Sequence, residues 1–163
     1  MITRNQRGFT LIEIVVVLVL ISIIATTVFT RSITTDQINF GAQTEKIKSH
    51  IRYAQSLAMK RNQFWGILCN GNEYWLFGPG ASPPIAITPV QLPGQNAAKI
   101  SLSDQGLDIP SQFILYFDGH GRPYQLATGA LVADLAITIE NLPDRSQSRI
   151  FSITAETGLI TTP

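Results

Sequence analysis

The stretch GFTLIE at residues 8–13 leads directly into an apolar run at residues 14–25 that only Ser22 interrupts. Residues 9–29 contain a single charged side chain, that of Glu13. As an α-helix rising about 1.5 Å per residue, these 21 residues cover the roughly 30 Å hydrocarbon core of a bilayer. A carboxylate in such a segment costs roughly 3 kcal/mol unless something pairs with it. The sequence therefore predicts a membrane-spanning helix and makes Glu13 a candidate functional residue.

Residues 4–13, RNQRGFTLIE, resemble the class III signal of type IV pilins and type II secretion pseudopilins. The resemblance implies that a membrane enzyme, the prepilin peptidase, cuts between Gly8 and Phe9 and methylates the new amino group of Phe9. It also implies that Glu13 pairs with the N-terminal amine of a neighbouring subunit in a filament. Gly8 and Phe9 are thus the predicted processing residues, and Glu13 is the predicted assembly residue.

Two simpler interpretations of the apolar run explain less of the sequence. A secretory signal peptide is cut after its apolar core, whereas residues 25–29, ATTVF, form a poor cleavage site. A plain single-pass anchor explains the run but neither the embedded Glu13 nor the junction between Gly8 and Phe9. The pilin-like interpretation accounts for all of these features.

The positive charges around the apolar run predict its orientation. Arg4 and Arg7 precede the run, and Arg31 follows it. Because cytoplasmic flanks carry an excess of Lys and Arg, we expect a single pass through the bacterial inner membrane with a cytoplasmic N-terminus and a periplasmic C-terminal domain. Together with the resemblance, this predicts four segments: a leader peptide at 1–8, a transmembrane and assembly helix at 9–30, an amphipathic second half of the helix at 31–62, and a periplasmic β domain at 63–163.

A continuous helix is predicted from about Phe9 to about Arg61, because no proline occurs before Pro79. Its second half has an apolar stripe at steps of three and four residues, which is typical of a helix packed on a globular core. The stripe consists of Phe40, Thr44, Ile47, Ile51, Ala54 and Ala58, with Leu57 beside it. The side expected to be opposite carries Lys46, Lys48, Arg52, Lys60 and Arg61.

After Asn62 the sequence changes to short β-like runs separated by turn residues. Residues 63–69 and 73–77 flank an Asn-Gly-Asn turn and predict a hairpin. Residues 78–96 hold five of the nine prolines and predict a long irregular loop. Further strands are expected at 98–102, 112–117, 123–127, 135–140, 149–154 and 159–162. The predicted fold class is α+β, with a long N-terminal α-helix, membrane-spanning in its first half, packed on an antiparallel β-sheet or a two-layer β-sandwich.

Within the pilin superfamily, the chain resembles the minor pseudopilin H and related minor pilins at residues 51–59, 117–123 and 153–160. The resemblance implies a low-copy structural subunit of a type II secretion pseudopilus. The alternative is a minor pilin of a type IV pilus, acting in adhesion or, with less support, in DNA uptake. The implied partners are the prepilin peptidase, the major pseudopilin or pilin, other minor subunits and an inner-membrane assembly platform. The loop at 78–96 is expected to face outward or toward one specific minor subunit.

The sequence predicts no enzyme, cofactor or metal site. It has no phosphate loop, nucleophile elbow or carboxylate pair. His50 is expected to be a solvated or packing residue on the helix, and His120 lies between two glycines in an expected turn, with no neighbouring ligands to complete a zinc site. The single cysteine, Cys69, has no partner for an internal disulfide and is expected to be buried on a strand.

The charge distribution argues against nucleic-acid binding. Residues 31–61 contain six Lys and Arg against two acids, whereas residues 62–163 contain four against eight. Affinity for nucleic acid rests on clustered cations that neutralise phosphates. A β domain with a net charge of −4 is a poor scaffold for such a cluster, although Arg145 and Arg149 are close in sequence.

Overall fold

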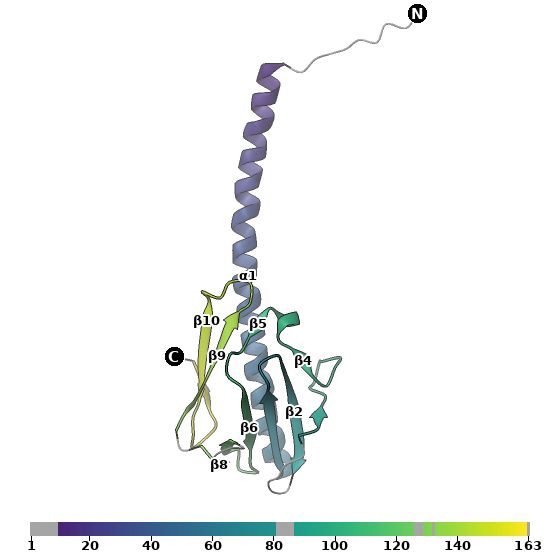
Figure 1. The fold of residues 1–163 in the computed structure, drawn as a ribbon, viewed down its shortest axis with the longest axis vertical. Helices are drawn as coiled ribbons and strands as arrows, with labels where there is room; N and C mark the ends of the chain where they lie inside the picture. The colour runs from purple at the N-terminus through teal and green to yellow at the C-terminus, as the bar shows by residue number, and fades with distance from the viewer. Residues whose placement is uncertain (1–9, 81–86, 126–128, 132, 163) are drawn as a thin grey trace, which may run out of the picture. The chain divides into compact units, whose positions relative to one another are not determined.

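The computed structural model describes residues 10–80, 87–125, 129–131 and 133–162 (Figure 1). The chain forms two compact units, Met1–Asn39 and Phe40–Pro163, and the boundary between them falls inside helix α1 (Leu11–Arg61). Within the described part of the chain, no helical stretch combines the length and the apolar character needed to cross a membrane. The predicted cleavage site, between Gly8 and Phe9, lies outside the described residues.

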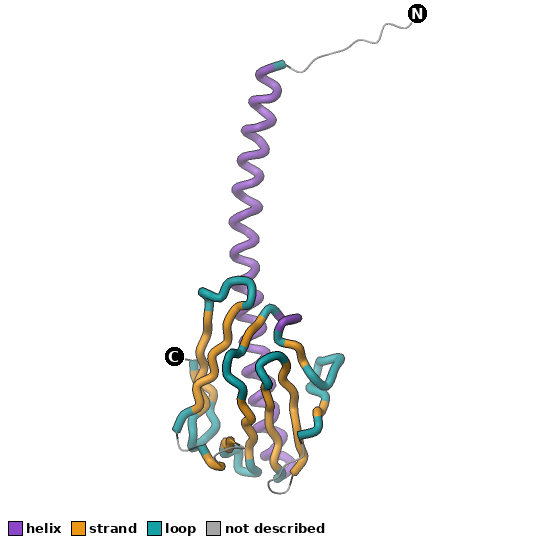
Figure 2. Tube along the Cα trace, in the orientation of Figure 1, coloured by secondary structure: helices purple, strands orange, loops and turns teal. Residues whose placement is uncertain are grey.

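The predicted apolar stripe of the helix is confirmed in the second unit. Its six members, from Phe40 to Ala58, are all at most 5% exposed, and Leu57 packs beside them. Figure 2 shows that the strands of this unit lie along the C-terminal part of the helix. The helix therefore supplies one wall of the hydrophobic core.

Two polar residues of α1 are buried, and for Lys48 this differs from the sequence prediction. Lys48, expected on the solvated side, is only 5% exposed, and its Nζ contacts the Glu45 carboxylate and donates to Thr162 Oγ1 at 3.0 Å. His50 is 6% exposed and is hydrogen-bonded to Tyr74. The physical reason is that the helix packs against two sheets, so that its buried face is wider than one apolar stripe.

The strands form two antiparallel sheets. In the first sheet the order is β3 (Pro89–Val90), β2 (Glu73–Gly80), β1 (Phe64–Cys69), β6 (Phe113–Phe117), β7 (Pro123–Gln125) and β8 (Gly129–Ala130), and β4 (Ile100–Ser101) also pairs with β2. In the second sheet the order is β11 (Ile160–Thr161), β10 (Ser148–Ile153), β9 (Leu135–Asn141) and β5 (Leu107–Asp108). A short 3₁₀ turn, η1 (Ser103–Gln105), precedes β5. The predicted α+β fold, a helix packed on antiparallel β-sheets, is confirmed.

The predicted hairpin is confirmed as β1 and β2, which pair with Cys69 opposite Tyr74. The side chain of Asn70 stabilises the turn, because its Oδ1 accepts hydrogen bonds from the backbone N–H groups of Asn72 (3.0 Å) and Glu73 (2.8 Å). Gly71 has φ +95°, a backbone conformation that residues with a Cβ atom rarely adopt.

The other six predicted strands are confirmed as β4, β6, β7, β9, β10 and β11, although β4 and β11 are shorter than expected. For β7 this holds up to Gln125, because residues 126–127 of the predicted strand lie outside the described residues. Strands β3, β5 and β8 were not predicted. Each of these strands has only two residues, which is too short for an alternating pattern to be recognised.

The expectation of an irregular loop over residues 78–96 is wrong in part, and residues 81–86 of that loop lie outside the described residues. Strand β2 continues to Gly80, and β3 returns to pair with it, Val90 lying opposite Leu76. Leu92 is 1% exposed and belongs to the core. A proline such as Pro89 is tolerated because β3 is the edge strand of its sheet.

Candidate functional site

The N-terminal end of α1 is capped by Thr10. The backbone N–H of Glu13 donates to Thr10 Oγ1 at 3.3 Å and to the Thr10 carbonyl at 3.1 Å. Thr10 and Glu13 have the spacing of a capping box, in which the hydroxyl satisfies a backbone donor that has no partner within the helix. The predicted assembly residue therefore lies in the first turn of α1, where a negative charge also complements the helix dipole.

The carboxylate of Glu13 has apolar surroundings. Ile14, Val17 and Leu18 line the helix surface beside it. Among the residues that the structure describes, Glu13 has no ion-pair partner. Large apolar side chains on every side of this helical segment are 45–82% exposed, from Leu11 to Ile24. A helix that is apolar all round needs other apolar groups around it, and a charge within that surface needs a counter-charge.

Residues 51–59, 117–123 and 153–160, which the sequence analysis singled out, meet at one place in the second unit. Gln55 of α1 donates from Nε2 to the carbonyl of Gly121, in the turn between β6 and β7, at 2.9 Å. The same amide donates to the carbonyl of Thr157, in the turn between β10 and β11, at 2.9 Å. Sequence reasoning did not predict this convergence, because the contacts are 66 and 102 residues apart along the chain.

The glycines at this junction allow the close approach. A Cβ on Gly158 would lie 2.7 Å from Gln55 Nε2 and 2.9 Å from the Gly121 carbonyl oxygen. Gly158 also has φ +67°. The junction thus joins both sheets to the helix through one amide side chain, and its chemistry is that of a structural contact rather than of catalysis.

His50 and Cys69 are buried, as a packing role requires. His50 Nδ1 lies 3.0 Å from the Tyr74 hydroxyl, and burial, with a smaller contribution from Lys46, lowers the pKa of His50 below 6.5. Cys69 lies on β1, where burial raises the pKa of its thiol. A thiol whose pKa is raised is a poor nucleophile.

His120 lies in the turn between β6 and β7. Its side chain is 82% exposed, and its backbone N–H donates to Asp118 Oδ1 at 2.9 Å. Asp118 also accepts from the backbone of Arg122, so its carboxylate closes the turn. Within the described ranges, no three His, Cys, Asp or Glu side chains gather as a metal site would require.

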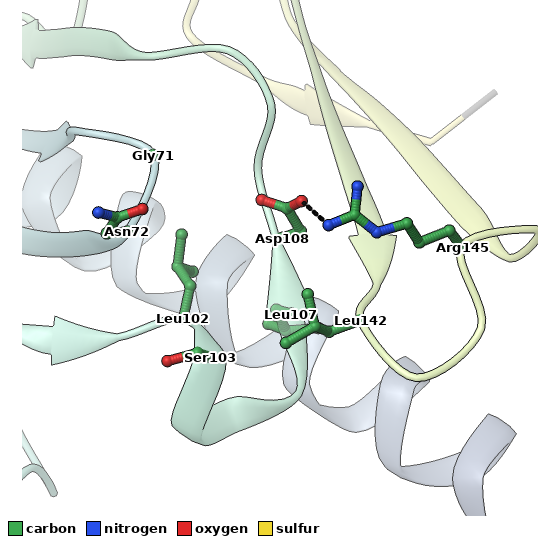
Figure 3. Close-up of a pocket in the computed structure, with 8 residues that line it drawn as sticks. All are labelled: Gly71, Asn72, Leu102, Ser103, Leu107, Asp108, Leu142 and Arg145. Atoms are coloured by element: carbon green, nitrogen blue, oxygen red, sulfur yellow. Dashed lines mark ion pairs between the residues drawn. The ribbon is translucent and has the colours of Figure 1, made fainter.

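A small polar pocket lies where both sheets approach η1 (Figure 3). Its volume is about 250 Å³, and an ion pair of 3.3 Å between Asp108 of β5 and Arg145 lies on one side of it. The other lining residues are Gly71, Asn72, Leu102, Ser103, Leu107 and Leu142. No local sequence signal connects Asp108 with Arg145, and the paired charges leave no group activated for chemistry.

Comparison with known proteins gives two matches. The prokaryotic N-terminal methylation motif matches residues 3–29. The type IV minor pilin FimU of Pseudomonas aeruginosa strain PAO1 has a similar fold, with a TM-score of 0.52 and 19% identity over 79% of this chain and 91% of FimU. No curated protein matches the chain. Neither match singles out minor pseudopilin H. The chain carries the N-terminal methylation motif of type IV pilin-like proteins on a pilin fold, which confirms the resemblance to that superfamily.

Proposed function

We propose that the chain is a minor, low-copy structural subunit of a type II secretion pseudopilus. The prepilin peptidase cuts between Gly8 and Phe9 and methylates Phe9. The apolar part of α1 then anchors the subunit in the inner membrane, and the β domain lies in the periplasm. The partners are the major pseudopilin, the other minor subunits and the inner-membrane assembly platform.

The observation that carries this proposal is the unpartnered carboxylate of Glu13 in the apolar first part of α1, within the methylation motif. In a low-dielectric bundle of helices, a methylated ammonium of one subunit and the carboxylate of Glu13 on the next compensate each other. Among the described residues, the Glu13 carboxylate has no ion-pair partner, which supports a counter-charge from a neighbouring subunit.

A second candidate function is that of a minor pilin in a type IV pilus. The similarity in fold to FimU, a type IV minor pilin, favours this candidate. Deletion of the chain distinguishes the two. Loss of an exported protein from the medium with normal surface pili supports the pseudopilus, and loss of surface pili with normal export supports the pilus.

Glu13→Ala tests the proposal. The variant should still be cleaved, because Gly8 is unchanged, but its recovery in purified filaments should fall strongly since the ammonium of the neighbour would be left without a counter-charge. Gln112→Ala, at an exposed uncharged position of the β domain, is the control and should assemble normally. Equal recovery of Glu13→Ala and the unaltered chain in filaments would contradict the pairing role.

A further inference from the structure

The C-terminal part of α1 has an exposed face opposite to the core. Its exposed residues include Arg52, Tyr53 and Lys60, with Met59 at the edge. Arg52 and Lys60 are eight residues apart and Tyr53 and Lys60 are seven, so these side chains share one side of the helix. Tyr53 is 38% exposed and Met59 is 53% exposed. We call these four residues the cationic helix face.

The two cations of this face are free of ion pairs within the described part of the chain. Among the described residues, neither Arg52 nor Lys60 has an ion-pair partner. The other lysines of the helix are engaged, since Lys46 donates to Gln105 at 3.3 Å and Lys48 contacts Glu45. Residues 49–61 contain no acid that would neutralise the face.

The β domain has the complementary charge. Residues 62–163 contain eight acids and four Lys or Arg. Two of those cations are already paired, Lys99 with Glu73 at 3.7 Å and Arg145 with Asp108 at 3.3 Å. The exposed carboxylates include those of Asp104, Asp134, Asp144 and Glu156. Helix and β domain are thus oppositely charged surfaces of one subunit, and a similar neighbour would present the acidic surface to the helix.

We propose that the cationic helix face docks on the carboxylate-bearing β domain of a neighbouring pilin-like subunit. This inference rests on the proposed function, because it requires a filament with a neighbouring subunit. Tyr53 and Met59 supply the apolar contact area, and Arg52 and Lys60 select an acidic partner. Exposed ion pairs contribute little affinity each, so the charges act mainly on partner choice and on the rate of association.

Nucleic acid fits the cationic helix face less well than an acidic protein surface does. Phosphate binding needs a cluster of cations that neutralises several phosphates. Only Arg52 and Lys60 lie on the face, because the Arg61 guanidinium lies over the Trp65 ring at 5.6 Å. The net charge of −4 on residues 62–163 would also repel a polyanion.

The test places the photo-cross-linker p-benzoylphenylalanine at Tyr53 of the full chain, in the bacterium that carries it. We expect a cross-link to the β domain of another filament subunit, identified by mass spectrometry. The same cross-linker at Gln112, an exposed residue outside the face, is the position control. A cross-link from Tyr53 to nucleic acid, or no cross-link to any subunit from assembled filaments, overturns the inference.

Reversing the charge of the cationic helix face is the second test of the proposal. Arg52→Glu with Lys60→Glu should reduce the Tyr53 cross-link about fivefold or more, because like charges would then meet at the interface. The neutral pair Arg52→Gln and Lys60→Gln, which should show an intermediate loss, controls for misfolding. An unchanged cross-link in the reversed variant overturns the inference. Absence of the chain from filaments would instead overturn the proposed function.

Discussion

Three ionisable residues of α1 have very different surroundings. Glu13 lies in an apolar, exposed helical surface without an ion-pair partner in the described part of the chain. Lys48 is buried, but its charge meets the Glu45 carboxylate. His50 is buried and neutral, with the Tyr74 hydroxyl as its partner. The structure of the second unit thus accounts for Lys48 and His50, whereas Glu13 has no ion-pair partner among the described residues.

His50 should make the stability of the second unit depend on pH. Burial lowers its pKa in the folded chain below the ordinary value of 6.5, so the unfolded chain binds a proton first as the pH falls. The free energy of unfolding should therefore be highest above pH 6.5 and should fall below it, by at most about 1.4 kcal/mol per pH unit. Urea unfolding of residues 31–163 at pH 7.5 and pH 5.5 measures this difference.

His50→Gln is the matched variant, because its amide retains a hydrogen bond to Tyr74 but does not titrate. The loss of stability between the two pH values should be smaller in this variant than in the unaltered fragment. An identical pH dependence in His50→Gln and the unaltered fragment would rule out His50 as its cause.

At the scale of secondary-structure elements, Gln55 joins α1 to turns of both sheets. Gln55→Ala removes the donor to the carbonyls of Gly121 and Thr157 and should lower the free energy of unfolding by about 1–3 kcal/mol. Gln43→Ala, the same substitution at a partly exposed position of the same helix, should change stability by less than about 0.5 kcal/mol. Urea unfolding of the two variants measures the difference, and equal stability would show that the junction contributes nothing.

The segment from β2 to β3 is the second element with a testable role. Because Leu92 is buried and β3 pairs with β2, replacing residues 79–93 by a tight turn should destabilise the second unit by about 2–5 kcal/mol. Thr88→Ala, at an exposed position of the same segment, should change stability by less than about 0.5 kcal/mol. The thermal midpoints of the two variants measure this, and similar midpoints would mean that the segment is a dispensable loop.

At the scale of the whole molecule, local periodicity predicted most of the second unit. The stripe from Phe40 to Ala58 and the longer strands have several residues in phase, so their buried faces could be identified from the sequence. The burial of His50 and Lys48 could not be identified from the sequence, because it depends on contacts with Tyr74 and Thr162, which are distant along the chain. The two-residue strands depend on pairing rather than on their own composition.

The candidate functional residues are likewise of two kinds, those that a local motif predicts and those that only the folded chain brings together. Residues 8–13 form a local motif, so Gly8, Phe9 and Glu13 could be predicted as processing and assembly residues from the sequence, and their roles stay predictions. The convergence of Gln55 with Gly121 and Thr157 could not be predicted, because only the folded chain brings these residues together. The pocket beside Asp108 and Arg145 depends equally on tertiary structure.

The mass of the mature N-terminus tests the central claim, that the chain is a processed pilin-like subunit, most directly. Mass spectrometry of the protein from membranes or filaments should find a chain that begins at Phe9 and carries one methyl group on its amine. Gly8→Val should yield only the uncut precursor, because the peptidase needs the close main-chain approach that glycine allows. A native chain that still begins at Met1, or one that is cut after the apolar run, would contradict the account.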